Sequence, residues 1–360
     1  MKWSYTIGRV AGTEIKVHVT FLILVAFWAL QGYQQGGATG AVAASVMLLA
    51  LFACVLLHEF GHILMARRFG VRTPDVILLP IGGVARLERI PSEPRQELLI
   101  AIAGPLVTLA IIVVLYLILL ATGAPPRLGE MDTNAGLLTF LFGLNVYLLL
   151  FNLIPAFPMD GGRVLRALLA SRLGLVRGTR LAATLGQFLA AAGGFYGLTT
   201  GNGWLILIAL FVFLGAGAEA SAVETRAAGE GLRVDQMMVT NFRTIPVYAT
   251  LSDAVELLLT GEQREFPVVD NLGRTEGLLT RDNLIRGLSQ RGAGSGVADS
   301  MTVSAPTVPP NLAFAEALER LRASGLPALP VVDAAGRLVG LLTLDNITDL
   351  LLVRRARSEI

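Results

Sequence analysis

The chain has few of the charged residues that water-soluble proteins use in abundance. Only 16% of its 360 residues are charged, and Lys2 and Lys16 are its only lysines. Hydrophobic residues make up 54% of the chain, and the mean hydropathy is +0.64. This balance excludes an ordinary soluble globular protein and is typical of a chain that crosses a membrane several times. Nucleic-acid-binding motifs are absent, so no nucleic-acid partner is expected.

Cysteine and histidine are scarcer still. The single cysteine, Cys54, has no partner within the chain, so no internal disulfide and no oxidising compartment are implied. The only histidines are His18, His58 and His62. A hydrolytic zinc site needs three protein ligands and one position open to water. A site built on the two neighbouring histidines therefore needs a third ligand, and the carboxylate of Asp160 is the best remaining candidate.

The stretch His58-Glu59-Phe60-Gly61-His62 carries the strongest chemical signal. On a helix the two histidines stand on one face, one turn apart. They can bind one zinc ion there, with Glu59 beside them as general base. The alternative is a pair of core histidines with a satisfied glutamate. The motif follows the apolar run 41–57, and ionisable groups at membrane depth are costly and usually functional, which favours the metal site.

A second stretch, Asn152 to Gly162, reads NLIPAFPMDGG. Together the two stretches resemble the site-2 protease family of intramembrane zinc metalloproteases, which pairs HExxH on one transmembrane helix with N-x-x-P-x-x-P-x-D-G on a later one. The resemblance implies zinc held by His58, His62 and Asp160, with Glu59 catalytic. The spacing nominates the histidines, and the choice of Asp160 rests on the resemblance as well as on the shortage of histidine. Asn152 either stabilises the substrate carbonyl or clamps two helices together.

Hydropathy predicts a polytopic α-helical membrane protein with about six transmembrane helices, near residues 17–33, 38–66, 98–120, 136–156, 181–199 and 203–219. With the N-terminus in the cytosol, the inner segments hold fourteen Lys and Arg residues, Arg89 among them, and the outer loops hold only Arg127. The positive-inside rule therefore predicts a multi-pass protein of the cytoplasmic membrane with both termini cytosolic.

Two intervening segments have features of their own. Residues 71–97 are too polar to span, and they predict two extended runs around a Gly82-Gly83 turn. This hairpin is either cytosolic and amphipathic or re-entrant, pairing with an extended substrate as an added strand, and the resemblance favours the second. Residues Ala103-Gly104-Pro105 match an A-G-P element of the family, which also suits a helix kink. Thr108 stands where many relatives have asparagine.

The C-terminal third contains an internal repeat with a constant offset of 63 residues. The second copy repeats the first at matched positions, as in Pro267-Val-Val-Asp270 with Pro330-Val-Val-Asp333. The copies resemble a tandem CBS-domain pair, an α+β fold whose cleft often binds adenine nucleotides. The resemblance nominates four residues for binding ATP, ADP or AMP: Thr280, Asp282, Thr343 and Asp345. Asn283 and Asn346 stand where that family has its ribose-contacting aspartate, and a docking or homodimerisation module is the alternative role.

The sequence thus predicts a protease domain (1–222), a linker (223–233), and a cytosolic CBS pair (234–292 and 297–355). The predicted function is an intramembrane zinc endopeptidase that hydrolyses membrane-embedded protein substrates in regulated proteolysis, with gating by adenine nucleotide. One rival is a CBS-gated transporter or channel whose His/Asp cluster forms an ion pathway, although transport needs no glutamate beside a metal-binding histidine. A metalloprotease acting on soluble substrates is the other, and it is expected to use a downstream glutamate in place of Asp160.

Overall fold

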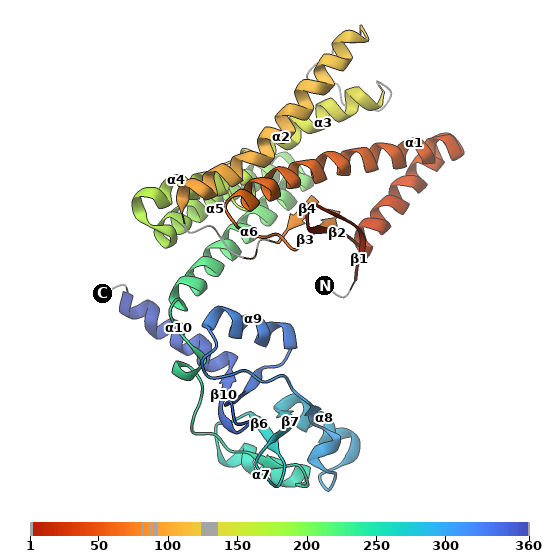
Figure 1. Ribbon diagram of the computed structural model, residues 1–360. Helices are drawn as coiled ribbons and strands as arrows, with labels where there is room; N and C mark the ends of the chain where they lie inside the picture. The colour runs from red at the N-terminus through yellow and green to blue at the C-terminus, as the bar shows by residue number, and fades with distance from the viewer. Residues whose placement is uncertain (1–2, 81, 87, 89–92, 124–135, 359–360) are drawn as a thin grey trace. The chain divides into compact units, whose positions relative to one another are not determined.

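The computed structural model describes residues 3–80, 82–86, 88, 93–123 and 136–358, so Arg89 and Arg127 lie outside the described residues. The chain forms two compact units, Met1–Val223 and Glu224–Ile360 (Figure 1). The first unit contains a four-stranded sheet and helices α1 to α6. The second unit consists of short strands and helices that follow the internal repeat.

Four helices of the described chain are long and apolar enough to cross a membrane: α1 (Val19–Arg68), α2 (Pro94–Ala121), α5 (Leu175–Thr200) and α6 (Gly203–Ala228). Helix α3 (Leu137–Asn152) is apolar but shorter, and α4 (Asp160–Leu173) precedes α5. Helix α1 is interrupted by the non-helical residues Gly36 and Gly37. A Cβ on Gly32 would lie 2.4 Å from the carbonyl oxygen of Gly40, so the two limbs pack closely around this turn and form a helical hairpin (Figure 1).

The sheet has the order β1-β2-β3-β4 and lies where α1 begins and ends. Its strands are β1 (Ser4–Val10), β2 (Thr13–His18), β3 (Asp75–Leu79) and β4 (Gly82–Ala85). Strands β2 and β3 are parallel, and the other two pairings are antiparallel. Alternate residues of β2 are buried, as a half-buried strand requires. The N-terminal hairpin β1–β2 has no counterpart in the sequence analysis, which predicts no strand before the first helix.

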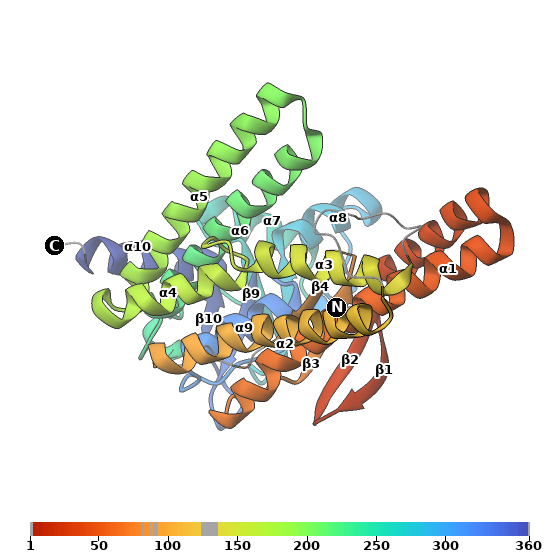
Figure 2. The same ribbon diagram turned by 90° about the horizontal axis from the view of Figure 1, so that it is seen from above.

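Three predicted boundaries differ from the observed ones. Gly82 and Gly83 lie inside strand β4, so the turn falls before them and not at the Gly-Gly pair. Helix α3 ends at Asn152, ahead of the two prolines that prevent regular helix. Helix α6 continues to Ala228, through the first half of the segment expected to be a linker. Helices α2 and α3 lie side by side, and α1 packs along α2 (Figure 2).

The second unit repeats one set of elements. The first copy contains β5 (Ile245–Pro246), α7 (Leu251–Thr260), β6 (Glu265–Val269), β7 (Thr275–Thr280) and α8 (Arg281–Arg291). The second contains β8 (Thr302–Val303), α9 (Phe314–Ser324), β9 (Ala328–Val332), β10 (Leu338–Thr343) and α10 (Leu344–Ser358). Short 3-10 turns, η2 (Val234–Gln236) and η3 (Val297–Asp299), precede them. One sheet has the order β5-β6-β7-β8, and β9 pairs with β10.

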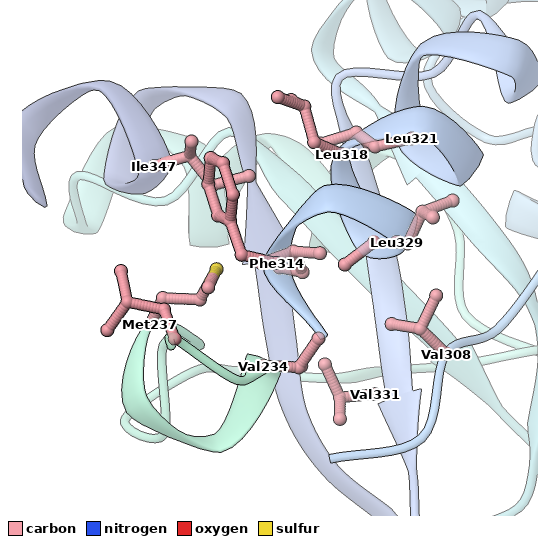
Figure 3. Close-up of a cluster of buried hydrophobic side chains, with 12 residues drawn as sticks. Val234, Met237, Val308, Phe314, Leu318, Leu321, Leu329, Val331 and Ile347 are labelled. Carbon is pink, nitrogen blue, oxygen red and sulfur yellow. The ribbon is translucent and has the colours of Figure 1, made fainter. Parts of the chain in front are cut away.

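The two copies exchange their leading segments. Val234, from the start of the first copy, is buried in the core formed by Phe314, Leu329 and other residues of the second (Figure 3). Val297, at the equivalent place in the second copy, is buried in the core of the first. Neither copy therefore completes its hydrophobic core alone, and the pair folds as one body.

Candidate metal centre

Both histidines of the HEFGH motif are buried on the second limb of α1. His58 is 8% exposed and His62 is 5% exposed, and their ring centroids lie 4.8 Å apart. Gly61 lies between them in sequence, and a Cβ there would approach the carbonyl oxygen of Ala103 to 2.7 Å. The glycine therefore allows α2 to lie directly against this turn of α1.

Helix α2 holds both imidazoles through their Nδ1 atoms. The hydroxyl of Thr108 lies 2.9 Å from Nδ1 of His58, and Nδ1 of His62 donates to the carbonyl oxygen of Ile100 at 2.7 Å. A carbonyl oxygen can only accept, so the proton of a neutral His62 is on Nδ1 and its Nε2 carries a lone pair. Partners of this kind orient metal-binding histidines and fix their tautomers. These contacts of Thr108 and Ile100 were not predicted from the sequence, because helix contacts between residues 50 and 38 positions apart leave no local pattern.

Gly104 makes this approach possible. A Cβ at that position would lie 2.1 Å from Nε2 of His62 and 2.8 Å from Nε2 of His58. Any side chain on Gly104 would thus occupy the space in front of both nitrogens. The glycine of the A-G-P element is thus required by the close approach of α2 to the two histidines, beyond any role in kinking the helix.

The carboxylate of Asp160 completes the cluster. Asp160 is the first residue of α4, is 6% exposed, and follows the turn that begins at Pro155. Its Oδ2 lies 3.1 Å from Nε2 of His58 and 3.2 Å from Nε2 of His62, and the two nitrogens are 3.1 Å apart. Among the described residues, this is the group of His, Cys, Asp and Glu whose ligand atoms converge closely enough to hold a metal ion.

The donor set fits zinc. If both imidazoles are neutral with Nδ1 protonated, three lone-pair atoms face one another with no proton between them, and a cation relieves that repulsion. Zinc bonds of about 2.0–2.1 Å in a tetrahedron separate neighbouring ligand atoms by about 3.3–3.4 Å. The observed separations of 3.1–3.2 Å are close to that value. Nitrogen and carboxylate ligands are also the types that zinc takes in hydrolytic sites.

The cluster opens into a cavity of about 340 Å³. Glu59 lines it beside the histidines, and so do Asn145, Asn152 and Arg163. Asn145 is 1% exposed and donates its amide to the carbonyl oxygen of Leu141 at 2.8 Å. All of strand β4 lines the same cavity, and a Cβ on Gly83 would lie 2.7 Å from Cγ of Glu59. Arg163 was not predicted as a site residue, although it follows Asp160 by one turn.

The remaining histidine and the nominated nucleotide residues lie elsewhere. His18 caps the N-terminus of α1, where its Nδ1 accepts from the backbone of Thr20, so it is not part of the cluster. Thr280 and Thr343 cap α8 and α10, and each hydroxyl accepts from the backbone N–H of the asparagine three residues on. Asp282 and Asp345 are exposed in the first turns of these helices.

The asparagines that stand in for a ribose-binding aspartate are already engaged. The side-chain amide of Asn283 donates to the hydroxyl of Thr302 at 3.2 Å, and that of Asn346 donates to the carbonyl oxygen of Met237. Burial raises the pKa of Glu265 on β6, and the carboxylates of Asp345 and Asp282 raise it further. The guanidinium of Arg264 opposes this rise, so three carboxylates and one guanidinium lie near one another here.

Apolar helices around a buried His-His-Asp cluster, with a glutamate in the same cavity, define a membrane-embedded metal-dependent hydrolase. Comparison with known proteins identifies it further. The family model described as "Peptidase family M50" matches residues 46–134 and 126–193, and the model described as "CBS domain" matches residues 234–290 and 297–353. The chain belongs to peptidase family M50, the site-2 protease family, and is an intramembrane zinc metalloprotease with a tandem CBS pair.

Relatives that cover most of the chain bear the names zinc metalloprotease or site-2 protease. A zinc metalloprotease of Methanocaldococcus jannaschii is 36% identical over 79% of this chain and 80% of its own length. A Mycobacterium tuberculosis protein that bears the name zinc metalloprotease Rip3 is 30% identical over 99% of this chain and 94% of its own. The solved site-2 protease of Methanocaldococcus jannaschii is 39% identical and covers 61% of this chain and 95% of its own, with a TM-score of 0.45.

Proposed function

We propose that His58, His62 and Asp160 hold the catalytic zinc of this intramembrane protease. The convergence of two imidazole Nε2 atoms and one carboxylate oxygen within 3.1–3.2 Å of one another carries this proposal. Three protein ligands leave a fourth position for water or for the substrate carbonyl. The open cavity lies on that side of the cluster, because Glu59 and Asn152 line it together with the three ligands.

The side chains around the metal site have separate roles in hydrolysis. Zinc, when bound, polarises the scissile carbonyl and lowers the pKa of water. Glu59 takes the proton of that water and later delivers it to the leaving amine nitrogen. Asn152 turns its amide N–H groups toward the carbonyl oxygen on which negative charge develops. Asn145 is seven residues earlier on the same helical face, and it supports this polar wall of the cavity.

The substrate is a transmembrane protein segment that lies beside strand β4 in an extended conformation. A helix engages its carbonyl groups in its own hydrogen bonds, so the segment must unwind locally before hydrolysis. Strand β4 pairs only with β3 among the described strands, which leaves its other edge available. The N–H of Arg86 donates to the carbonyl oxygen of Asp75, on β3. Because successive N–H groups alternate along a strand, those of Ala85 and Gly83 point to the open edge.

Metal content and cleavage test the ligand and base roles separately. In purified full-length protein, Asp160→Ala and His58→Ala should each lose most of the roughly one zinc per chain. Glu59→Gln should keep its zinc, because Glu59 is not a ligand, and lose proteolysis. His18→Ala is the matched control, since His18 caps a helix, and it should keep its zinc. Full zinc retention in Asp160→Ala would refute the ligand assignment.

The chain crosses the cytoplasmic membrane six times, with both termini in the cytosol. The two limbs of α1 supply the first and second crossings, and α2, α3, α5 and α6 supply the rest. Hairpin β3–β4 extends from the cytosolic side to the metal centre as a re-entrant element. Within this arrangement residues 1–222 are the protease domain, 234–292 and 297–355 are the CBS copies, and 223–233 connect them, partly as the end of α6.

The CBS pair binds adenine nucleotide weakly and regulates the protease. Thr280 and Thr343 offer hydroxyl protons to a ribose, and Asp282 and Asp345 offer carboxylates nearby. Asn283 and Asn346 use their amide groups within the protein, so they add little. The acidic surroundings, which include Glu265, oppose the phosphate groups of ATP and ADP more than the single phosphate of AMP.

Calorimetric titration of the whole protein with AMP, ADP and ATP, beside cleavage assays, tests this regulation. AMP should bind most tightly. If the CBS pair has two arrangements that differ in their effect on the protease, AMP can change the cleavage rate only as far as its affinities for those two arrangements differ. Asp282→Ala with Asp345→Ala should weaken the binding. A nucleotide concentration of about 1 mM reveals binding free energies of about −4 kcal/mol. If that concentration produces neither heat nor a change in cleavage rate, the pair is a docking or homodimerisation module.

A further inference from the structure

A buried arginine lies behind the metal centre, outside the catalytic steps. Arg166, on α4, is 3% exposed. Its Nε lies 2.5 Å from Oε1 of Glu97 on α2, and its Nη1 donates to the carboxylate of Glu219 on α6. Burying a charge is costly, and a buried pair is strongly destabilised when one partner is removed. The three helices are therefore tied together at this point by charge.

The same guanidinium covers the turn that leads to Asp160. Its central carbon lies 5.1 Å from the ring centroid of Phe157, within the range of a cation–π contact. Phe157 is 1% exposed and precedes Asp160 by three residues. A Cβ on Gly162 would lie 2.6 Å from the backbone nitrogen of Phe157, so the first turn of α4 lies directly against this turn. The position of Phe157 and that of the Asp160 carboxylate are thus linked within one tight segment.

Helix α6 contacts this segment directly. A Cβ on Gly215 would lie 3.0 Å from Cδ of Pro158. Glu219, which pairs with Arg166, follows Gly215 by one helical turn and shares its face. Helix α6 therefore packs against the turn at Pro158, and it pairs by charge with Arg166, whose guanidinium lies over Phe157 of the same turn. It is also the helix that continues along the chain into the second unit, which begins at Glu224.

We propose that Arg166 is the positioning residue for the Asp160 carboxylate. Held by Glu97 and Glu219, its guanidinium fixes the Phe157–Pro158 turn so that Oδ2 of Asp160 stays within reach of both histidine nitrogens. Glu219 makes that position depend on where α6 lies. The inference rests on the proposed ligand role of Asp160.

The rate at which zinc passes from the folded, detergent-solubilised full chain to a chelating dye tests this role. Arg166→Gln should accelerate zinc loss by about 10–100-fold, the usual effect of removing a residue that orients a metal ligand. Glu219→Gln should have a smaller effect in the same direction, because Glu97 still holds the guanidinium. Arg166→Lys keeps the positive charge but loses the planar guanidinium with its paired N–H donors. Its rate of zinc loss should lie between those of wild type and Arg166→Gln. Arg172→Gln, an exposed change on the same helix, is the matched control.

The thermal midpoint of each metal-free variant separates positioning from general stability. A merely structural arginine would lower that midpoint and leave the zinc off-rate of the folded protein unchanged, and this result would overturn the proposal. If Arg166→Gln does not fold, an off-rate equal to wild type in both Arg166→Lys and Glu219→Gln would overturn it as well. Asp160→Ala is run in parallel. Zinc retention in that variant would refute the ligand assignment, whereas zinc loss there with normal retention in the Arg166 variants would refute the positioning role alone.

Discussion

The hydroxyl of Thr108 lies 2.9 Å from Nδ1 of His58 and 3.5 Å from the carbonyl oxygen of Gly104. The hydroxyl can donate to that carbonyl while it accepts from Nδ1–H, which leaves Nε2 of His58 with its lone pair toward Nε2 of His62 and Oδ2 of Asp160. The carbonyl oxygen of Ile100 likewise accepts from Nδ1–H of His62, so Nε2 of His62 also keeps its lone pair. One helix therefore sets the tautomers of two histidines that belong to another helix.

Replacing Thr108 by valine tests this arrangement. Thr108→Val keeps the shape of the side chain and removes the acceptor, so the Nδ1–H of His58 becomes a buried, unpaired donor. We expect zinc affinity to fall by about 10-fold or more, measured by competition with a chelating dye. Thr108→Ser, which keeps the hydroxyl, should stay near wild type. Equal affinity in the valine and serine variants would show that the hydroxyl does not orient the imidazole.

Gly104→Ala should abolish zinc binding although it adds a single methyl group. That group would lie 2.1 Å from Nε2 of His62, where the metal bond must form. Gly193→Ala is the control, because Gly193 is also a helical glycine but has no atom within 4 Å of an added Cβ. The control should gain up to about 1 kcal/mol of helix stability and keep its metal. Metal analysis after size-exclusion chromatography compares the two, and a zinc-loaded Gly104→Ala would contradict the observed packing.

The sequence analysis could group His58, His62 and Asp160 because their signals are local or belong to a motif, and the structure brings these three side chains together. Their role as zinc ligands stays a prediction. Two histidines four residues apart share a helical face wherever that helix lies. The environment of the ligands could not be predicted in this way. Thr108, Ile100 and Gly104 meet α1 through a helix-to-helix approach, and nothing in the spacing of α2 specifies which of its residues faces α1.

The same limit applies to the sheet and to the second unit. Strand β2 alternates buried and half-buried residues, but it has only six residues and leads directly into an apolar run, which hid the pattern. The 63-residue repeat predicted two similar copies. It could not predict that Val234 completes the core of the second copy and Val297 that of the first, because a repeat fixes what each segment is and not which neighbour it packs against.

Acid should weaken the sheet through Asp75. The guanidinium of Arg86 and the ammonium of Lys16 hold the pKa of this carboxyl below its usual range. The folded-state pKa is depressed, so the stabilisation is fully present above the unfolded value of about 3.9 and is lost as pH falls through the folded value. Asp75→Asn should cost about 1–3 kcal/mol at neutral pH, and its difference from wild type should shrink below about pH 4.

Hydrogen exchange of the β2 and β3 amides measures this local stability. Glu14→Gln is the control, because Glu14 also pairs with Lys16, at 3.0 Å, but is more exposed. That change should cost less than about 1 kcal/mol. A difference between Asp75→Asn and wild type that stays constant down to pH 2 would mean that the carboxylate charge is not what stabilises the sheet.

The proposed six-crossing topology predicts which sites are accessible from outside the cell. A cysteine at residue 35, beside the break in α1, should react with an impermeant thiol reagent added outside. A cysteine appended after residue 360 should react only once the membrane is opened. Both are placed in a Cys54→Ala background, since Cys54 is the only native cysteine. External labelling of the C-terminal cysteine would contradict an even number of crossings.

The open edge of β4 should be essential for cleavage and dispensable for zinc. Ala85→Pro removes an N–H that points away from β3, and proline is tolerated on that side of an edge strand. We expect its zinc content to stay at the wild-type level and cleavage of a transmembrane substrate to fall, mainly through a higher KM. Val84→Pro is the matched comparison, since it removes an N–H that pairs with β3 and should disrupt the hairpin itself, seen as faster exchange of the β3 amides. Normal cleavage by a zinc-loaded Ala85→Pro variant would exclude pairing of the substrate with β4 as an added strand.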